Sequence, residues 1–427
     1  MLSLPTLPAR RGRVLILIVG LFGGVVGSVY MLALRELTDL LGPDRWSAMS
    51  HLIILVAVGI TVGLIVHWMG KPDDVELLVN NIHVNGGNKH VRGLRSLIPI
   101  SLLCVAAGGT LGPEAPLVTT TGTLGSILGR RARLSTTDIR VLSITGMAAG
   151  FTVLFGAPLG SAVFALEILH RKGMEYYEAL MPAVVGSLCG YAIALATGAL
   201  GMEPIWSFPS VSTPVPADLL LGVLAGVGGA LVAVAFTYLA IALRWAVSVV
   251  PVGLRPLLGG LLLAALAAIS PFALTNGEYQ MQDMTTSKLM VGTLLLAAGV
   301  KLVAAAVALV CGWRGGFIIP LFFVGFALGR AAEGHLGNGH VWVLVTGLMV
   351  ACNVGVTKTP LGSTLVVTEM AGFVMLPTTL TAAMVALLLT SGVGLIETQR
   401  RRLGVSEEGE GDAPPAPTPT PGLAGIT

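Results

Sequence analysis

The chain has 427 residues, of which 54% are hydrophobic and only 11% are charged, and its mean hydropathy is +0.86. An ordinary soluble domain carries about 25% charged residues, so this composition predicts an integral membrane protein. The formal net charge is only +3 and the arginines form no stripe, which argues against nucleic acid as a partner. The four cysteines have no paired spacing, so we expect no disulfide framework, no metal site and no cofactor.

The first apolar run extends from Val14 to Leu34 and follows a short arginine-containing segment. It is too long for the core of a signal peptide and long enough to cross a ~30 Å hydrocarbon layer, so we expect a retained first span. Several later stretches are too short to cross, which predicts helices that begin inside the membrane. The later apolar stretches are 50–69, 95–112, 116–129, 141–154, 158–169, 178–200, 217–250, 255–275, 287–312, 317–333, 341–355, 360–375 and 377–396.

The chain divides into three expected parts: an N-terminal segment (1–13), a transmembrane domain (14–402) and a proline-rich, disordered tail (403–427). Arginine clusters occur at Arg10 to Arg13 and at Arg400 to Arg402. Because positive residues favour the cytoplasmic side, we expect both termini in the cytoplasm. The expected location is the cell membrane, as a multi-pass protein of a prokaryotic inner membrane.

An internal duplication is the most informative feature of the sequence. Residues 145–168 read TGMAAGFTVLFGAPLGSAVFALEI and residues 346–370 read TGLMVACNVGVTKTPLGSTLVVTEM, so TG, PLGS and a glutamate recur in order. Membrane proteins with such repeats commonly consist of two inverted halves around a central site. We therefore expect an all-α membrane fold of tilted and broken helices, with pseudo-symmetric halves at about 14–200 and 215–402.

Three segments have a glycine and a proline ahead of an apolar run: Gly70 to Pro72, Gly112 to Pro116 and Gly315 to Pro320. Proline is favoured in the first turn of a helix, so each segment predicts a helix start. The first N–H groups of a helix lack partners and carry partial positive charge. Three such starts that converge would hold a dehydrated anion without a full cation, which would also allow fast release.

Glu114 is an acid at one of these helix starts, between glycine, prolines and apolar residues. A carboxylate inside a membrane is costly unless it has a function or a partner. It could fill the anion site when charged and open it when protonated, or it could simply cap a helix. The residues alone favour the role of a gate and the role of a helix cap equally.

Together these segments resemble the CLC family, the voltage-gated chloride channels and chloride/proton antiporters, over about residues 15–402. GPEAP is similar to the family motif G-(K/R)-E-G-P, which makes Glu114 the gating glutamate, and GFIIP is similar to G-x-F-x-P. The resemblance implies a homodimer with one pore per subunit in the lipid bilayer, and no enzymatic activity. The anion-binding positions that it implies are Met69, Gly70, Pro72, Gly112, Ala115, Pro116, Gly316, Phe317, Ile318, Ile319, Pro320 and Ile396.

Three positions depart from the family pattern. Met69 stands where chloride-transporting members have a serine that coordinates the central anion, and Ile396 stands where a tyrosine is expected. Ile168 stands where proton-coupled members often carry an internal acid, while Glu167 matches a structural glutamate. These departures predict a weaker central site and an apolar inner side.

The expected function is chloride transport, gated by Glu114, with proton-coupled exchange slightly ahead of a passive chloride channel. The methionine at position 69 makes a fluoride/proton antiporter a further alternative, and the lost hydroxyls make a degenerate, non-conducting member another. A membrane enzyme is disfavoured because neither H-E-x-x-H nor G-x-S-x-G occurs. A cation or solute transporter is disfavoured because helix amino ends dominate the site.

Two sets of charged residues have structural explanations. Asp73 and Asp74 follow Pro72, where capping of a helix start is favoured over ion binding. Lys301 lies in an apolar stretch, where we expect it to extend to the membrane interface rather than to neutralise a carboxylate.

Overall fold

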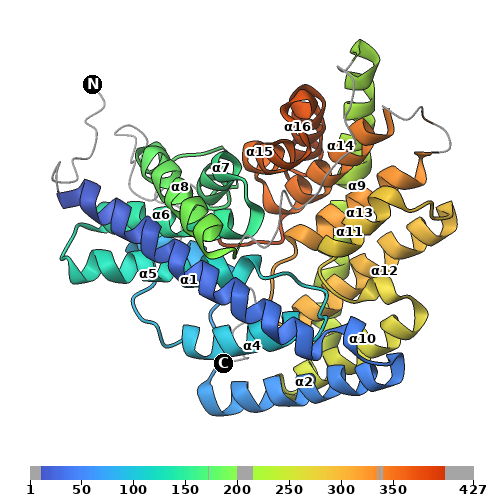
Figure 1. Ribbon diagram of the computed structural model, residues 1–427, viewed down its shortest axis with the longest axis horizontal. Helices are drawn as coiled ribbons and strands as arrows, with labels where there is room; N and C mark the ends of the chain where they lie inside the picture. Colours follow the sequence, from blue (N-terminus) through green and yellow to red (C-terminus); the bar gives the residue numbers. More distant parts are fainter. Residues whose placement is uncertain (1–10, 172, 200–214, 334–335, 337–339, 400–427) are drawn as a thin grey trace, which may run out of the picture.

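The computed structural model describes residues 11–171, 173–199, 215–333, 336 and 340–399. Over these ranges the chain forms sixteen α-helices and no strand longer than one isolated bridge (Figure 1). The helices are α1 (Arg11–Leu41), α2 (Ala48–Met69), α3 (Val75–Asn85), α4 (Leu94–Ala106), α5 (Glu114–Arg131), α6 (Thr136–Phe155), α7 (Pro158–Glu167), α8 (Leu180–Thr197), α9 (Pro216–Val247), α10 (Arg255–Ile269), α11 (Glu278–Thr286), α12 (Val291–Val310), α13 (Ile318–Ala331), α14 (His340–Thr357), α15 (Pro360–Ala371) and α16 (Leu376–Leu389). Short 3₁₀ turns cover Pro43–Arg45, Tyr177–Ala179, Val252–Leu254, Pro271–Ala273 and Phe373–Met375.

Helices long enough to cross a membrane occur together with helices that are too short to do so, as the lengths of the apolar stretches predicted. In the described ranges, eight helical segments are long and apolar enough to cross a bilayer: α1, α2, α6, α8, α9, α10 with the 3₁₀ turn before it, α12 and α14. Others are much shorter, such as α7 with 10 residues and α15 with 12, whereas a span needs about 20. The prediction of an all-α membrane protein with broken helices is therefore confirmed.

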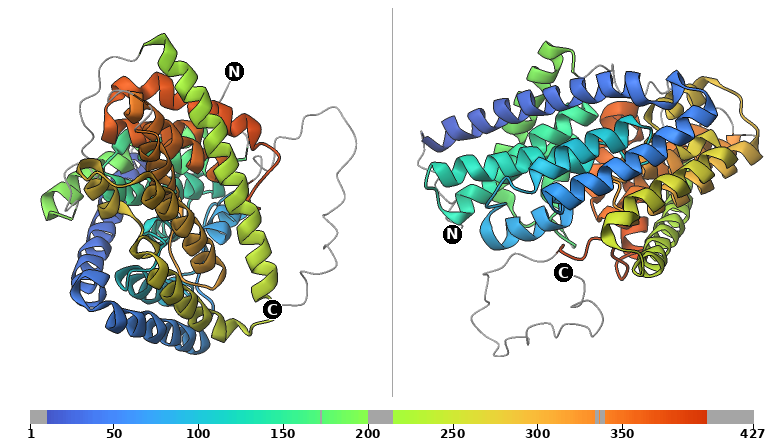
Figure 2. Two further views of the ribbon diagram at one scale, coloured as in Figure 1. Left: turned by 90° about the vertical axis from the view of Figure 1, so that its right-hand side faces the viewer. Right: turned by 90° about the horizontal axis from the view of Figure 1, so that it is seen from below.

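The two halves repeat the same packing pattern. In the first half α1 packs against α6 and α8, and α5 packs against α6. In the second half α9 packs against α14 and α16, and α13 packs against α14. Figure 2 shows α9 as one long helix along an edge of the bundle. The duplicated sequence thus corresponds to duplicated architecture, with α6–α7 and α14–α15 as the repeated pairs.

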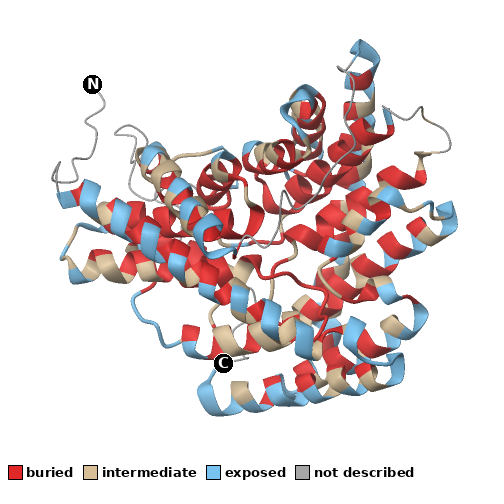
Figure 3. Ribbon diagram, viewed as in Figure 1, coloured by how far each residue is buried: buried red, intermediate tan, exposed pale blue. Residues whose placement is uncertain are grey.

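The two repeated TG segments lie in the most enclosed helices of the molecule. In α6 and α14, 94% and 89% of the span is buried, whereas only 22% is buried in the span that contains α10 (Figure 3). A side chain at Gly146 would overlap the backbone oxygen of Thr121 on α5. Small residues permit such close helix approach in membranes, where packing rather than water drives association.

The two halves are joined by a reciprocal contact between α7 and α15. The Glu167 carboxylate at the end of α7 accepts hydrogen bonds from the first N–H groups of α15, Gly362 N at 2.7 Å and Leu361 N at 3.2 Å. Glu369 of α15 accepts in turn from Gly160 N of α7 at 2.9 Å. Each carboxylate therefore satisfies unpaired donors at the positive end of the other helix.

The glycine of each PLGS copy makes this contact possible. An added Cβ at Gly160 would lie 2.5 Å from the backbone nitrogen of Val366, and one at Gly362 would lie 2.5 Å from the Cα of Phe164. Neither neighbour could move, because both are backbone atoms. The repeated PLGS and glutamate are thus explained as one self-complementary packing unit.

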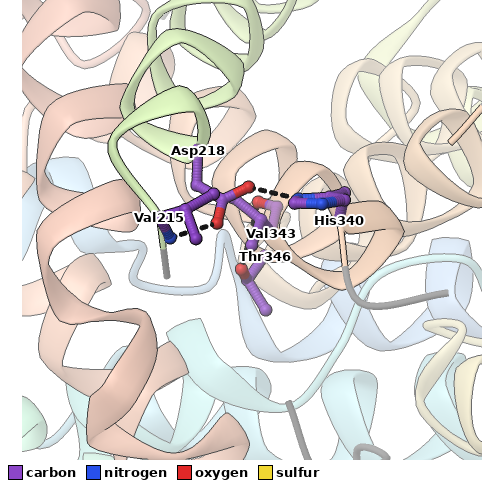
Figure 4. A network of polar contacts seen from close by, with 5 residues as sticks. All are labelled: Val215, Asp218, His340, Val343 and Thr346. Carbon is purple, nitrogen blue, oxygen red and sulfur yellow. Dashed lines mark hydrogen bonds and ion pairs between the residues drawn. The ribbon is translucent and has the colours of Figure 1, made fainter. Parts of the chain in front are cut away.

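The start of α9 is held against the start of α14 by a buried carboxylate. Asp218 in the first turn of α9 accepts from Val215 N at 2.8 Å and lies 2.5 Å from Nδ1 of His340 (Figure 4). The Asp218 side chain is only 4% exposed, so this contact fixes the relative position of two long helices.

The first span begins at Arg11 and ends at Leu41, so it is longer than the apolar run from Val14 to Leu34. Residues 1–10 and 400–427 lie outside the described residues, and with them Arg10, the cluster Arg400 to Arg402 and the tail 403–427. The cytoplasmic location of both termini, and the boundaries of the three parts, stay predictions.

Replacement of Glu167 by alanine should destabilise the protein by about 1–3 kcal/mol, because the buried N–H of Gly362 and the partly buried N–H of Leu361 lose their acceptor. Thermal unfolding of purified protein in detergent measures the effect. Glu36→Ala is the matched control, since Glu36 is exposed on α1. Equal stability of the two variants would show that the contact between the halves is dispensable.

Candidate functional site

A cavity of about 180 Å³ lies where three helices begin. The first residues of α3, α5 and α13, namely Val75, Glu114 and Ile318, all line it. The first N–H groups of a helix lack partners within the helix, so each of these three starts contributes a partial positive charge beside the cavity. The volume accommodates several water molecules or a small dehydrated ion, since water occupies about 30 Å³ per molecule in the liquid.

The segments that lead into α5 and α13 are paired by two backbone hydrogen bonds. Gly112 N donates to Gly316 O at 2.8 Å and Gly316 N donates to Gly112 O at 2.6 Å. Both positions must be glycine, because a Cβ at either one would collide with the Glu114 carboxylate. Two helix starts from opposite halves are thereby fixed beside each other.

The Glu114 side chain occupies the start of α13, in the other half of the molecule. Its Oε1 accepts from Ile319 N at 2.7 Å, and its Oε2 is buried without a hydrogen-bond partner. The residue is 1% exposed and lines the cavity. Glu114 is thus the first residue of one helix and the cap of another.

The cavity is lined in part by apolar residues from other segments of the chain. Ile168 and Ile396 line it, at 4% and 6% exposure, together with Leu395 and Thr357. The segment that follows α16 is held there by Gln399, whose Nε2 donates to the backbone oxygens of Ile168 at 3.0 Å and Thr357 at 2.7 Å. Ile396 is therefore brought to the cavity from a distant part of the chain.

The structure brings only some of the predicted anion-binding positions to this cavity. The lining positions are Ala115, Pro116, Gly316, Phe317, Ile318 and Ile396, together with Glu114. Gly112, Ile319 and Pro320 lie behind them, where Gly112 pairs with Gly316 and Ile319 N holds Glu114. Met69, Gly70 and Pro72 do not line it.

The first of the three predicted helix starts is displaced along the chain. Helix α2 continues to Met69, which is 47% exposed and borders a separate, more open cavity with Gly70. Helix α3 begins only at Val75 rather than at Pro72, because Asp74 caps it by accepting from Leu77 N at 2.8 Å. The predicted capping role is confirmed for Asp74.

Charged residues that the sequence analysis did not connect with this site lie along its α3 side. They are Asp73, Asp74, Glu76, Arg244 and Arg314, with Arg314 and Asp74 paired at 3.7 Å. Burial and the neighbouring Asp74 raise the pKa of Asp73, while Arg314 lowers it. Arg314 lies within the G-W-R-G-G stretch and could have been noticed, whereas nothing local marks Arg244 at the far end of α9.

A threonine that the sequence analysis also missed borders the cavity and has a hydroxyl group without a partner. Thr119 on α5 is fully buried and lines the cavity, and its Oγ1 has no hydrogen-bond partner. The sequence shows it only as one of three consecutive threonines, 119–121, so nothing distinguishes it there.

Lys301 does not extend to an interface, so that prediction is wrong. Its side chain is fully buried, and Nζ donates to the backbone oxygens of Leu274 at 2.8 Å and Thr275 at 2.7 Å and to Gln280 Oε1 at 3.0 Å. Thr275 N in turn donates to Gly108 O at 2.8 Å, ahead of the segment that leads into α5. Lys301 thus satisfies buried carbonyls and secures the loop that supports the Glu114 segment.

Comparisons with known proteins agree with this architecture. A family model described as voltage gated chloride channel matches residues 75–391. The chain is 28% identical over 403 residues to the chloride/fluoride channel protein of Pseudomonas syringae pv. tomato, covering 90% of this chain and 85% of that one.

Two solved structures are similar in fold. A CLC-type fluoride/proton antiporter matches with a TM-score of 0.75 at 21% identity, over 91% of this chain and 97% of its own. A slow cyanobacterial Cl⁻/H⁺ antiporter matches with a TM-score of 0.76 at 20% identity, over 90% of this chain and 95% of its own. At these identities the structures establish a shared fold.

Proposed function

The chain belongs to the voltage-gated chloride channel (CLC) family, and on this basis we propose that it carries chloride across the membrane through the cavity at the helix starts, with Glu114 as its gate. The contact between the Glu114 carboxylate and Ile319 N is the observation that carries the proposal. It supports an anionic group as the natural occupant of the α13 start.

The gate follows from competition for the same donors. A charged Glu114 is favoured at the start of α13 by the N–H of Ile319 and by the helix dipole. Protonation removes the charge and with it most of this attraction, so the side chain leaves and a free anion takes its place. When the anion moves on, the carboxylate loses its proton and returns.

Proton-coupled exchange is the first form of this proposal. Each opening of the gate needs one proton on Glu114, and Oε2 is buried without a partner, which leaves it free to receive one. A passive chloride channel is the alternative, supported by Ile168, which lines the cavity without any group that could carry a proton.

Chloride is favoured over fluoride by the composition of the cavity wall. Ile168, Ile396, Met147 and Phe151 are among the apolar residues that line it. Fluoride holds its hydration water more strongly than chloride, so a wall with few donors compensates its dehydration less well. Met69, the residue that suggested fluoride in the sequence, lies at a different cavity. Fluoride remains the alternative substrate because a relative and a solved structure that resemble this chain have fluoride in their names.

Glu114→Gln should abolish proton movement and leave anion conduction, because glutamine neither carries a proton nor holds a charge at the α13 start. Chloride efflux and pH change are recorded together in liposomes, with and without an imposed voltage, with Glu36→Gln on the exposed face of α1 as control. Anion flux without protons in wild type and variant would assign a channel. No anion flux in folded protein would assign a non-conducting family member.

In the same vesicles, chloride flux of the wild type should exceed fluoride flux at equal gradients, for the reason of dehydration given above. Ion-selective electrodes for both anions make the comparison direct. A larger fluoride flux, accompanied by protons, would replace the chloride proposal by fluoride/proton antiport.

We further propose a homodimer that covers α7, α8, α15 and α16. Helices α7 and α15 are too short to cross the membrane, so their polar ends need a protein cover on the side where Leu159 and Leu361 are exposed. Light scattering in detergent should give the mass of two chains for wild type, and Leu361→Trp should shift it toward one. A monomeric wild type would contradict the dimer.

A further inference from the structure

Three consecutive threonines of α5 differ in what their hydroxyl groups do. Thr120 Oγ1 donates to Pro116 O at 2.8 Å and Thr121 Oγ1 donates to Leu117 O at 3.0 Å, the usual bond of a helical threonine to the carbonyl four residues earlier. Thr119 Oγ1 makes no such bond, and no other described residue accepts from it. The same helix, with the same residue type, thus leaves one donor unused.

The residue that carries the unused donor borders the cavity. Thr119 is 0% exposed and lines the cavity that Glu114 also lines. A buried hydroxyl without a partner is unfavourable, so such groups are rare unless a water or a ligand satisfies them. Nearby positions on this wall, Val118, Met147 and Phe151, offer no acceptor from their side chains.

We propose that Thr119 is an anion-coordinating residue, whose hydroxyl donates a hydrogen bond to the inorganic anion in the cavity. The proposal rests on the proposed function, because it needs an anion in that cavity. A hydroxyl is suited to this role: it binds a dehydrated anion without a full charge, so the ion can still leave. It also supplies a side-chain donor to a cavity whose opposite wall has isoleucine at positions 168 and 396.

The hydroxyl can be removed with little change of volume by Thr119→Val. Chloride binding to purified protein in detergent, measured by calorimetry, should weaken by at least about tenfold, as expected for loss of a hydrogen bond to a charged group. The chloride concentration for half-maximal flux in liposomes should rise in parallel. Thr120→Val is the matched control, because its hydroxyl is bonded to the backbone, and it should bind chloride as the wild type does.

A second pair of variants separates the hydroxyl from folding and packing. Thr119→Ser keeps the donor and Thr119→Ala lacks it, while both lose the methyl group. Serine should bind chloride at least about tenfold more tightly than alanine. If Thr119→Val does not fold, this pair carries the test alone.

Two outcomes would overturn the inference, and they differ from failure of the proposed function. If Thr119→Val or Thr119→Ala binds chloride as tightly as wild type, the hydroxyl faces only water. If Thr120→Val weakens binding equally, the effect belongs to the packing of α5. By contrast, a folded wild type that neither binds nor transports an anion would reject the function itself.

Discussion

The centre of this molecule depends on helix starts whose N–H groups are buried away from water. In a soluble protein such groups are satisfied by solvent, but in a membrane they need an acceptor from the protein or a ligand. At α13 the acceptor is the Glu114 carboxylate, and at α15 it is the Glu167 carboxylate. The paired glycines 112 and 316 keep the first of these arrangements in place. In the proposed gating step, a free anion would replace the Glu114 carboxylate at the start of α13 while these glycine contacts stay in place.

Short helices are what allow these starts to lie at membrane depth. A helix that crosses the bilayer has its ends in water, whereas α5, α7, α13 and α15 begin next to other helices. Their ends are therefore satisfied within the protein, by side chains from the other half in the cases of Glu114, Glu167 and Glu369. A carboxylate at the start of another helix thus occurs both at the candidate site, with Glu114, and at the contact between the two halves, with Glu167 and Glu369.

Much of this could be predicted from the sequence, because local patterns carry it. The PLGS repeat, the prolines and glycines at helix starts and the position of Glu114 follow from spacing and residue type. Other features depend on where distant segments meet, and no local pattern reports that. Arg244 reaches the cavity from the far end of α9, and Thr119 differs from Thr120 only in its surroundings. The position of Met69 at the end of α2, away from the cavity, is likewise a tertiary feature. So is the burial of Lys301 against the backbone oxygens of Leu274 and Thr275.

The contact between Glu167 and Glu369 has the symmetry of an isologous interface. Each half offers the same pieces, a glycine that admits the partner and a glutamate that caps it, and each accepts the same pieces in return. A chain of half this length would therefore already carry a complete surface for pairing with its own copy. Fusion of two such genes would preserve that surface unchanged.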